Sequence, residues 1–152
     1  MGIKCPCGVY VDAAATDQNV QFLSGANTPV NATGDLSYYA KVCVTTLAYS
    51  TVKLDFVDTT DAAATTRSFT FTSTSITDVE CDRQGPNCVV TVRGTGTVTG
   101  CTTVYNFEAD FRDQAYGSYD QVSNFTISGF FRQTGAVNVA QGSVKALGCC
   151  ER

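Results

Sequence analysis

The chain has 152 residues, enough for a single domain with a substantial hydrophobic core. Its formal net charge is −4 and it contains no cluster of Lys or Arg, which argues against the basic surface that nucleic-acid binding requires. It contains no histidine, which excludes Ser-His-Asp and Cys-His catalytic arrangements and any metal site built on imidazole.

The composition favours strands over helices. The chain has 22 threonines and 18 valines, residue types that fit the pleated, half-buried surface of a sheet. Its apolar runs are only a few residues long, too short for a membrane-spanning helix, and we expect no membrane insertion. The composition therefore predicts an all-β fold.

In chain order, the sequence divides into a connector arm at 1–15, a body at 16–148 and a tail at 149–152. The arm holds Cys5 and Cys7 and only a brief apolar run, and we expect it to be extended. The tail holds Cys149 and Cys150. Both ends of the chain are therefore rich in cysteine.

Within the body, segments rich in Val, Thr and aromatic residues alternate with Gly, Pro, Asn and Asp turn signals. The segments predicted to be strands are 20–23, 36–47, 51–57, 67–77, 88–99, 103–113, 125–131 and 137–147. The clearest two-residue alternation puts Phe107 and Phe111 on one face of the hairpin arm 103–113. Gly94 and Gly96, inside another strand, indicate a bulge or a close backbone approach. About eight to ten short strands predict a jelly-roll-type β-sandwich, with a barrel as the second choice.

Eight cysteines are more than a reduced cytosolic protein usually carries, and their even number indicates an oxidised protein held by disulfides. Cys81 and Cys88 flank a strong turn signal at 82–87. Facing positions of a hairpin are close enough for a disulfide, so we predict that these two cysteines pair within one subunit. Cys43 and Cys101 lie within or beside the body, where they either pair with each other or remain small buried thiols.

The four terminal cysteines, Cys5, Cys7, Cys149 and Cys150, allow three interpretations. They could form clips within one subunit, or supply four thiolates to zinc, although neither end has the usual ligand spacing. The third interpretation, which we prefer, is disulfides between subunits. Adjacent cysteines rarely bond to each other, so Cys149 and Cys150 would reach two different partners.

A short arm with closely spaced cysteines, ahead of a Thr/Val-rich β-domain with few charges, resembles the endospore appendage subunits of Bacillus-type bacteria. The resemblance implies a jelly roll whose N-terminal connector reaches into a neighbouring subunit and forms intersubunit disulfides there. Only Cys5 and Cys7 match the connector. The sequence departs from the family in having Cys-Pro-Cys in the arm, a vicinal cysteine pair at the other end, and a longer body.

Carboxylates are the remaining candidates for a catalytic or metal site. Glu108 and Asp110 lie two residues apart on one strand face, as in some retaining glycosidases, but a solvated strand face explains them better. Two groups of acidic residues could gather calcium at strand ends, although neither has EF-hand spacing; they are Asp55, Asp58 and Asp61, and Asp110, Asp113 and Asp120. We expect no enzyme activity, no metal and no cofactor.

The sequence therefore predicts a structural subunit that self-assembles head to tail into a disulfide cross-linked fibre, outside the cell or on a spore surface, without a classical signal peptide in this chain. Its expected partners are other copies of itself and related fibre or coat subunits, not nucleic acid. The alternative is a secreted carbohydrate- or surface-binding β-sandwich with internal disulfides only. Its binding surface would use the aromatic pairs Tyr38 and Tyr39 or Tyr116 and Tyr119.

Overall fold

The computed structural model describes residues 6–23, 29–59 and 67–148. Most of these residues are in strands: β1 Gly8–Phe22, β2 Val30–Cys43, β3 Thr51–Asp58, β4 Phe69–Gln84, β5 Asn87–Val98, β6 Val104–Asp113, β7 Tyr119–Ile127, β8 Phe131–Gln133, β9 Val137–Ala140 and β10 Val144–Leu147. The described residues contain one 3₁₀ helix, η1 Val44–Tyr49, which connects β2 and β3. No helix among the described residues is long and apolar enough to cross a membrane. The predicted all-β fold is confirmed.

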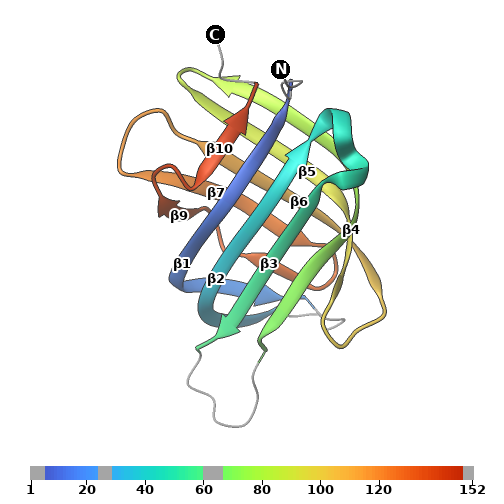
Figure 1. The fold of residues 1–152 in the computed structure, drawn as a ribbon. Helices are drawn as coiled ribbons and strands as arrows, with labels where there is room; N and C mark the ends of the chain where they lie inside the picture. The colour runs from blue at the N-terminus through green and yellow to red at the C-terminus, as the bar shows by residue number, and fades with distance from the viewer. Residues whose placement is uncertain (1–5, 24–28, 60–66, 149–152) are drawn as a thin grey trace.

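The strands form one antiparallel sheet that closes into a barrel (Figure 1). Each strand from β1 to β8 pairs with the next in sequence, and β1 pairs with β8 through Val20↔Gln133 and Phe22↔Phe131. The expected jelly-roll sandwich is not confirmed, because the sheet is a meander with no crossover between two layers. Short alternating strands are typical of both architectures, so their pattern alone does not distinguish a barrel from a sandwich.

The eighth position of the barrel is divided among three short strands. β8 pairs with both β7 and β1, whereas β9 pairs only with β7 and β10 only with β1. Gly135 and Gly142, with φ of 83° and 89°, lie in the two bends between them, a backbone conformation that favours glycine. The predicted strand 125–131 is likewise interrupted, because Gly129 turns the chain between β7 and β8 with φ of 77°.

Aromatic side chains fill the interior of the barrel. The largest fully buried ones are Tyr38, Phe56, Phe71, Phe111, Phe125 and Phe131, and burying each phenylalanine stabilises the fold by about 2–3 kcal/mol. The predicted close approach at the two strand glycines is also confirmed. A Cβ on Gly96 would overlap the Phe71 ring, and one on Gly94 would lie 3.0 Å from the Phe107 ring.

Residues 8–15, predicted to belong to the arm, are the first half of β1. They pair with β2 along their whole length, and Gly8 to Val11 also pair with β10. Val9 and Val11 are fully buried, so this segment contributes to the core. The strand β1 therefore extends across the predicted boundary at residue 15, and the alternation of Val9 and Val11 with Tyr10 and Asp12 has the two-residue period of a strand.

Candidate functional site

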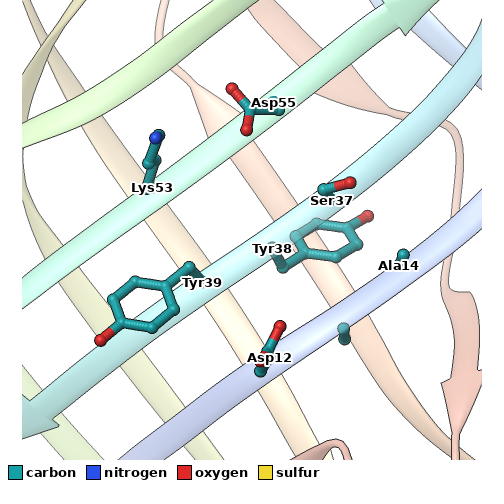
Figure 2. A pocket seen from close by; sticks show the side chains of 8 residues that line it. Asp12, Ala14, Ser37, Tyr38, Tyr39, Lys53 and Asp55 are labelled. Carbon is teal, nitrogen blue, oxygen red and sulfur yellow. The ribbon is translucent and has the colours of Figure 1, made fainter.

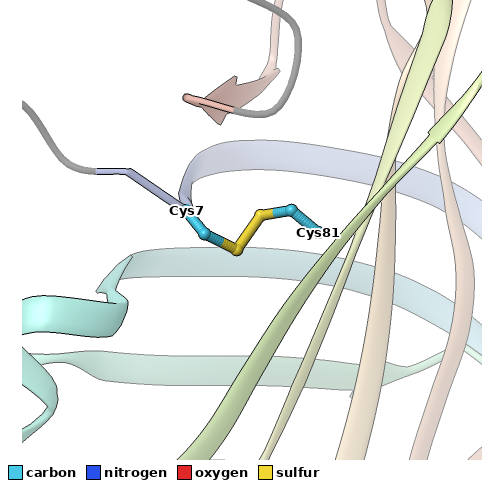
Figure 3. Close-up of a disulfide and its surroundings, with 2 residues drawn as sticks. All are labelled: Cys7 and Cys81. Atoms are coloured by element: carbon cyan, nitrogen blue, oxygen red, sulfur yellow. A yellow bond between two sulfur atoms is a disulfide. The ribbon is translucent and has the colours of Figure 1, made fainter.

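One disulfide joins the beginning of β1 to β4 across one end of the barrel. Cys7 and Cys81 are bonded with an S–S distance of 2.05 Å and a Cα–Cα distance of 5.8 Å, and 74 residues separate them (Figure 3). β1 and β4 are not neighbours in the sheet, so the bond connects strands that the hydrogen-bond ladder does not. Closing a loop of this length stabilises the folded chain by about 4 kcal/mol on the chain-entropy account.

This bond corrects two predictions. Cys7, expected to bond to another subunit, bonds within its own chain, and Cys81 does not bond to Cys88. The physical reason is the register of the β4–β5 hairpin, in which Cys88 faces Arg83 and Cys81 faces Val90. The strands extend further into the predicted loop than its turn signals suggested, so the two cysteines are not opposite each other.

Cys43 and Cys88 are each disulfide-bonded as well, and their partners are cysteines other than Cys7, Cys81 and Cys101. Cys43 ends β2 opposite Gly8, and Cys88 is a fully buried residue at the beginning of β5. All four bonded cysteines of the described chain therefore lie where β1 begins, which we name the proximal end. The predicted cysteines Cys5, Cys149 and Cys150 lie outside the described residues.

Cys101 is the exception, because it is a free and exposed cysteine. The predicted pairing of Cys43 with Cys101, and the alternative of a buried thiol at Cys101, are therefore wrong. Cys101 lies in the turn between β5 and β6. Because consecutive strands are antiparallel, this turn is at the barrel end opposite the β4–β5 hairpin. We name the end with Cys101 the distal end; β1 begins and β10 ends at the other end of the barrel (Figure 1).

Hydrogen bonds from the backbone and hydroxyl of Thr103 lower the pKa of the Cys101 thiol, and the Tyr105 hydroxyl adds to this effect. A lower pKa increases the thiolate fraction at neutral pH, and the thiolate is the form that attacks a disulfide. The hydroxyl of Tyr105 has a raised pKa, mainly because of desolvation and secondarily because of the nearby thiolate charge. Cys101 is therefore chemically suited to disulfide exchange.

Beside Cys101 is a surface pocket of about 360 Å³, which we name the distal pocket. The residues that define it are Phe22, Arg67, Phe69, Thr99, Cys101 and Phe130. The Phe130 ring packs edge-on against both other phenylalanines, with centroid distances of 5.7 Å to Phe22 and 5.1 Å to Phe69. No local sequence pattern indicates this pocket, because four segments that are distant in the chain form it.

A second surface lies on the outer face of β1, β2 and β3. A shallow groove of about 420 Å³ is lined by Asp12, Ser37, Tyr39, Lys53 and Asp55, among others (Figure 2). The Tyr39 ring lies edge-on to Tyr10 at 6.2 Å, and both side chains are partly exposed.

The prediction that Tyr38 and Tyr39 are both exposed is therefore wrong for Tyr38. Tyr38 is 2% exposed, and burial raises the pKa of its hydroxyl. Because successive residues of a strand point to opposite faces, two adjacent tyrosines cannot both face outward. The outward partner of Tyr39 is Tyr10 on β1, which the sequence did not indicate, whereas the expected Tyr116 and Tyr119 are exposed.

The predicted carboxylates have structural partners. Glu108 and Asp110 share the outer face of β6, where Arg93 Nε donates to Glu108 at 2.8 Å and the Thr91 hydroxyl donates to Asp110 at 2.6 Å. Arg93 also pairs with Asp78 and Glu80. Its hydrogen bond to Glu108, followed by those to Glu80 and Asp78, raises the pKa of the guanidinium. The arrangement is therefore an exposed ion-pair network between neighbouring strands.

Asp113 and Asp120 hold the last strands in place. Asp120 is buried and accepts backbone N–H groups of Gln114, Gly142 and Val144, at 2.8 to 3.1 Å. Asp113 accepts the N–H of Ala146 at 2.9 Å. Desolvation is the main reason that the pKa of Asp113 is raised, and the Asp120 charge adds to it.

In the described part of the chain, neither predicted group of calcium ligands forms a metal site. No group of three or more His, Cys, Asp or Glu side chains in the described segments is arranged to hold a metal ion. Asp55 accepts a hydrogen bond from the Thr70 hydroxyl and Asp58 one from the Arg67 backbone, whereas Asp61 lies outside the described residues.

Comparisons with protein-family models, with curated proteins and with solved structures give no match for this chain. The feature with a defined chemical reactivity is the Cys101 thiol at the distal end.

Proposed function

We propose that the protein is a structural subunit that polymerises head to tail through disulfides between copies. The observation that carries the proposal is the placement of the cysteines. Cys101 is free and exposed at the distal end, whereas Cys7, Cys43, Cys81 and Cys88 are already bonded and lie at the proximal end.

The number of cysteines supports the same proposal. Eight cysteines can all pair within one chain, but a free Cys101 leaves seven, an odd number. At least one other cysteine must then lack a partner in the same chain. The proposed cross-link uses this cysteine, one of Cys5, Cys149 and Cys150, in one copy and Cys101 in the next.

The two reactive positions belong to different surfaces, which favours an open chain of subunits over a closed dimer. A contact between unlike surfaces leaves one of each surface free after every addition, so it propagates unless a ring closes. A closed barrel also has few unpaired strand edges, so growth by strand pairing is less favourable than end-to-end contact.

The cross-link proposed here differs from the one that the resemblance to endospore appendage subunits implies. That resemblance assigned the cross-linking role to Cys5 and Cys7, and Cys7 bonds to Cys81 of its own chain. The proposed location is outside the cell or on a spore surface, where oxidising conditions maintain disulfides.

The test is electrophoresis of the purified full-length chain after incubation with oxidised glutathione. We expect a ladder of multimers without reductant that collapses to monomer with reductant. Cys101→Ser should abolish multimers larger than a dimer, because each copy then lacks its distal thiol. Thr102→Ser, an exposed change in the same turn, is the matched control and should leave the ladder intact. An undiminished ladder from Cys101→Ser would rule the proposal out.

The outer groove supports a second candidate, carbohydrate binding. Tyrosine rings offer flat apolar surface to a sugar ring, and carboxylates accept hydrogen bonds from its hydroxyls. Tyr39 lines this groove together with Asp12 and Asp55, and the Tyr10 ring packs edge-on against Tyr39. Native electrophoresis through gels containing a soluble β-glucan, xylan or mannan would test it. Retardation that Tyr39→Ala removes would support binding, and equal mobility in every gel would count against it.

A further inference from the structure

The distal pocket has an apolar wall and a polar side. Phe22, Phe69 and Phe130 form the wall, and Arg67 and Cys101 lie on the polar side. Phe22 and Phe69 are buried, with 6% and 7% of their surface exposed, whereas Phe130 is only partly buried. Phe130 is therefore the ring of this wall with most apolar surface left for a docking chain to cover. The pocket therefore combines an apolar contact, a cation and a reactive thiol in one place.

The charge beside the pocket is not neutralised internally. Within the described ranges, the Arg67 guanidinium has no carboxylate partner, although its backbone N–H donates to Asp58 Oδ2 at 3.0 Å. The Arg67 side chain therefore presents a positive charge at the edge of the pocket. An occupant that carries a carboxylate would complement this charge.

Two segments of this chain carry cysteines that could reach the pocket of a neighbouring copy. Residues 1–5 contain Cys5 and one charged side chain, Lys4, which has the same sign as Arg67. Residues 149–152 contain Cys149 and Cys150, followed by Glu151, whose charge is opposite to that of Arg67, and by Arg152. Charge complementarity thus favours the C-terminal segment.

We propose that the distal pocket binds residues 149–152 of a second copy, with Glu151 against Arg67 and Cys149 or Cys150 bonded to Cys101. This inference rests on the proposed polymerisation and specifies the segment that carries it out. β10 ends at the proximal end, and four extended residues span at most about 14 Å, so the proximal end of one barrel must lie against the distal end of the next.

The covalent step needs an oxidant, for which a low-molecular-weight disulfide such as oxidised glutathione is sufficient. The Cys101 thiolate attacks one sulfur of this disulfide, forming a mixed disulfide and releasing one thiolate. The tail thiolate then attacks the Cys101 sulfur, forming the intersubunit bond and releasing the second thiolate. The two protein thiols lose two protons and two electrons, and the small disulfide becomes two thiols.

The experiment measures multimer formation by the full-length chain with oxidised glutathione at low salt, and maps the cross-linked peptides. Arg67→Glu and Glu151→Arg should each slow multimer formation roughly threefold to fivefold, because each places like charges together. The double variant, which exchanges the two charges, should recover most of the rate. Lys53→Glu, a charge reversal on the outer groove, is the matched control and should react like the wild type.

Peptide mapping should find Cys101 bonded to Cys149 or Cys150 of another copy. Since Glu151→Arg changes no residue of the described barrel, this variant also separates docking from any folding defect caused by Arg67→Glu. A wild-type ladder in which Cys101 is bonded to Cys5, or no recovery in the double variant, would overturn tail docking while the polymerisation proposal stands. Absence of any wild-type ladder would overturn both.

Discussion

The hydroxyl of Tyr38 donates a hydrogen bond to Gln133 Oε1 at 2.6 Å inside the barrel, although 95 residues separate the two side chains. Gln133 Nε2 donates to the carbonyls of Val122 and Gly135 at 2.7 and 3.0 Å. One buried amide thus links β2, β7 and the bend after β8. Buried polar groups cost little when all their hydrogen bonds are made and much when one partner is removed.

Gln133→Leu should lower the free energy of unfolding by about 2–4 kcal/mol, because it leaves the Tyr38 hydroxyl and two buried carbonyls without partners. Tyr38→Phe should cost less, about 1–2 kcal/mol, since it leaves only the Gln133 amide oxygen unpaired. Urea unfolding of both single variants and the double variant would measure the coupling. Strictly additive effects would show that the two side chains do not interact.

Cys7→Ser combined with Cys81→Ser should lower the free energy of unfolding by about 2–4 kcal/mol, because the reduced chain regains the entropy of a 74-residue loop. Cys101→Ser should change it by less than about 0.5 kcal/mol, since Cys101 is exposed and free. Thermal unfolding of monomeric samples measures both. In the multimer assay we expect the reverse, with Cys101→Ser reducing multimer formation more than the Cys7→Ser and Cys81→Ser double variant does. Equal effects of the two changes in either assay would contradict the division between proximal and distal cysteines.

Asp113 should make stability depend on pH. Its raised pKa means that the folded state holds this proton more tightly than the unfolded state does, so its contribution to stability is present at low pH and lost as pH rises through the folded pKa. Asp113→Asn keeps an acceptor for the Ala146 N–H without the charge. The variant should therefore be more stable than the wild type at pH 7, and the difference should shrink toward pH 4. Melting temperatures across this range check it, and a difference that is the same at every pH would refute it.

Gly96→Ala should destabilise the barrel by about 1–3 kcal/mol, because the added methyl overlaps the Phe71 ring and the Thr72 carbonyl. Gly100→Ala is the control for glycine itself. Its Cβ would meet nothing within 4 Å, but its φ of 78° disfavours alanine, so we expect a cost of about 1 kcal/mol. Phe71→Leu in the Gly96→Ala background should recover part of the loss, and no recovery would show that the ring is not the obstacle.

The thiol of Cys101 should react with iodoacetamide faster at pH 7 than an unperturbed cysteine, because hydrogen bonds from Thr103 lower its pKa. Thr103→Val removes the hydroxyl but keeps the backbone N–H, so it should raise the pKa only in part. The pH profile of alkylation measures this shift directly. An unchanged profile in Thr103→Val would assign the effect to the backbone alone.

Local patterns predicted much of the fold. The hairpin that joins β5 and β6, its buried Phe107 and Phe111, and the close approach at Gly96 all follow from two-residue alternation and glycine placement. Barrel closure was not predictable in this way, because it depends on pairing between Phe22 and Phe131, which no local pattern connects.

The candidate site was harder to predict for a similar reason. The Cys7–Cys81 bond depends on two strands that are not neighbours in the sheet meeting at the proximal end. The register that separates Cys81 from Cys88 is set by how far the strands extend into the turn, which composition does not specify. Cys101 could be recognised as free only from the folded chain, in which the other four described cysteines are disulfide-bonded.

The position of the short strand β10 determines how the barrel would respond to a pulling force. It runs antiparallel to β1 through four residue pairs and is fastened to the barrel by Asp113 and Asp120. Tension applied at Gly148 would pull β10 along its own axis and shear these pairs together, because ladder hydrogen bonds lie perpendicular to the strands. The load would then pass into β1 and, through the Cys7–Cys81 bond, into β4, so a pulled molecule would share the force between two sides of the barrel.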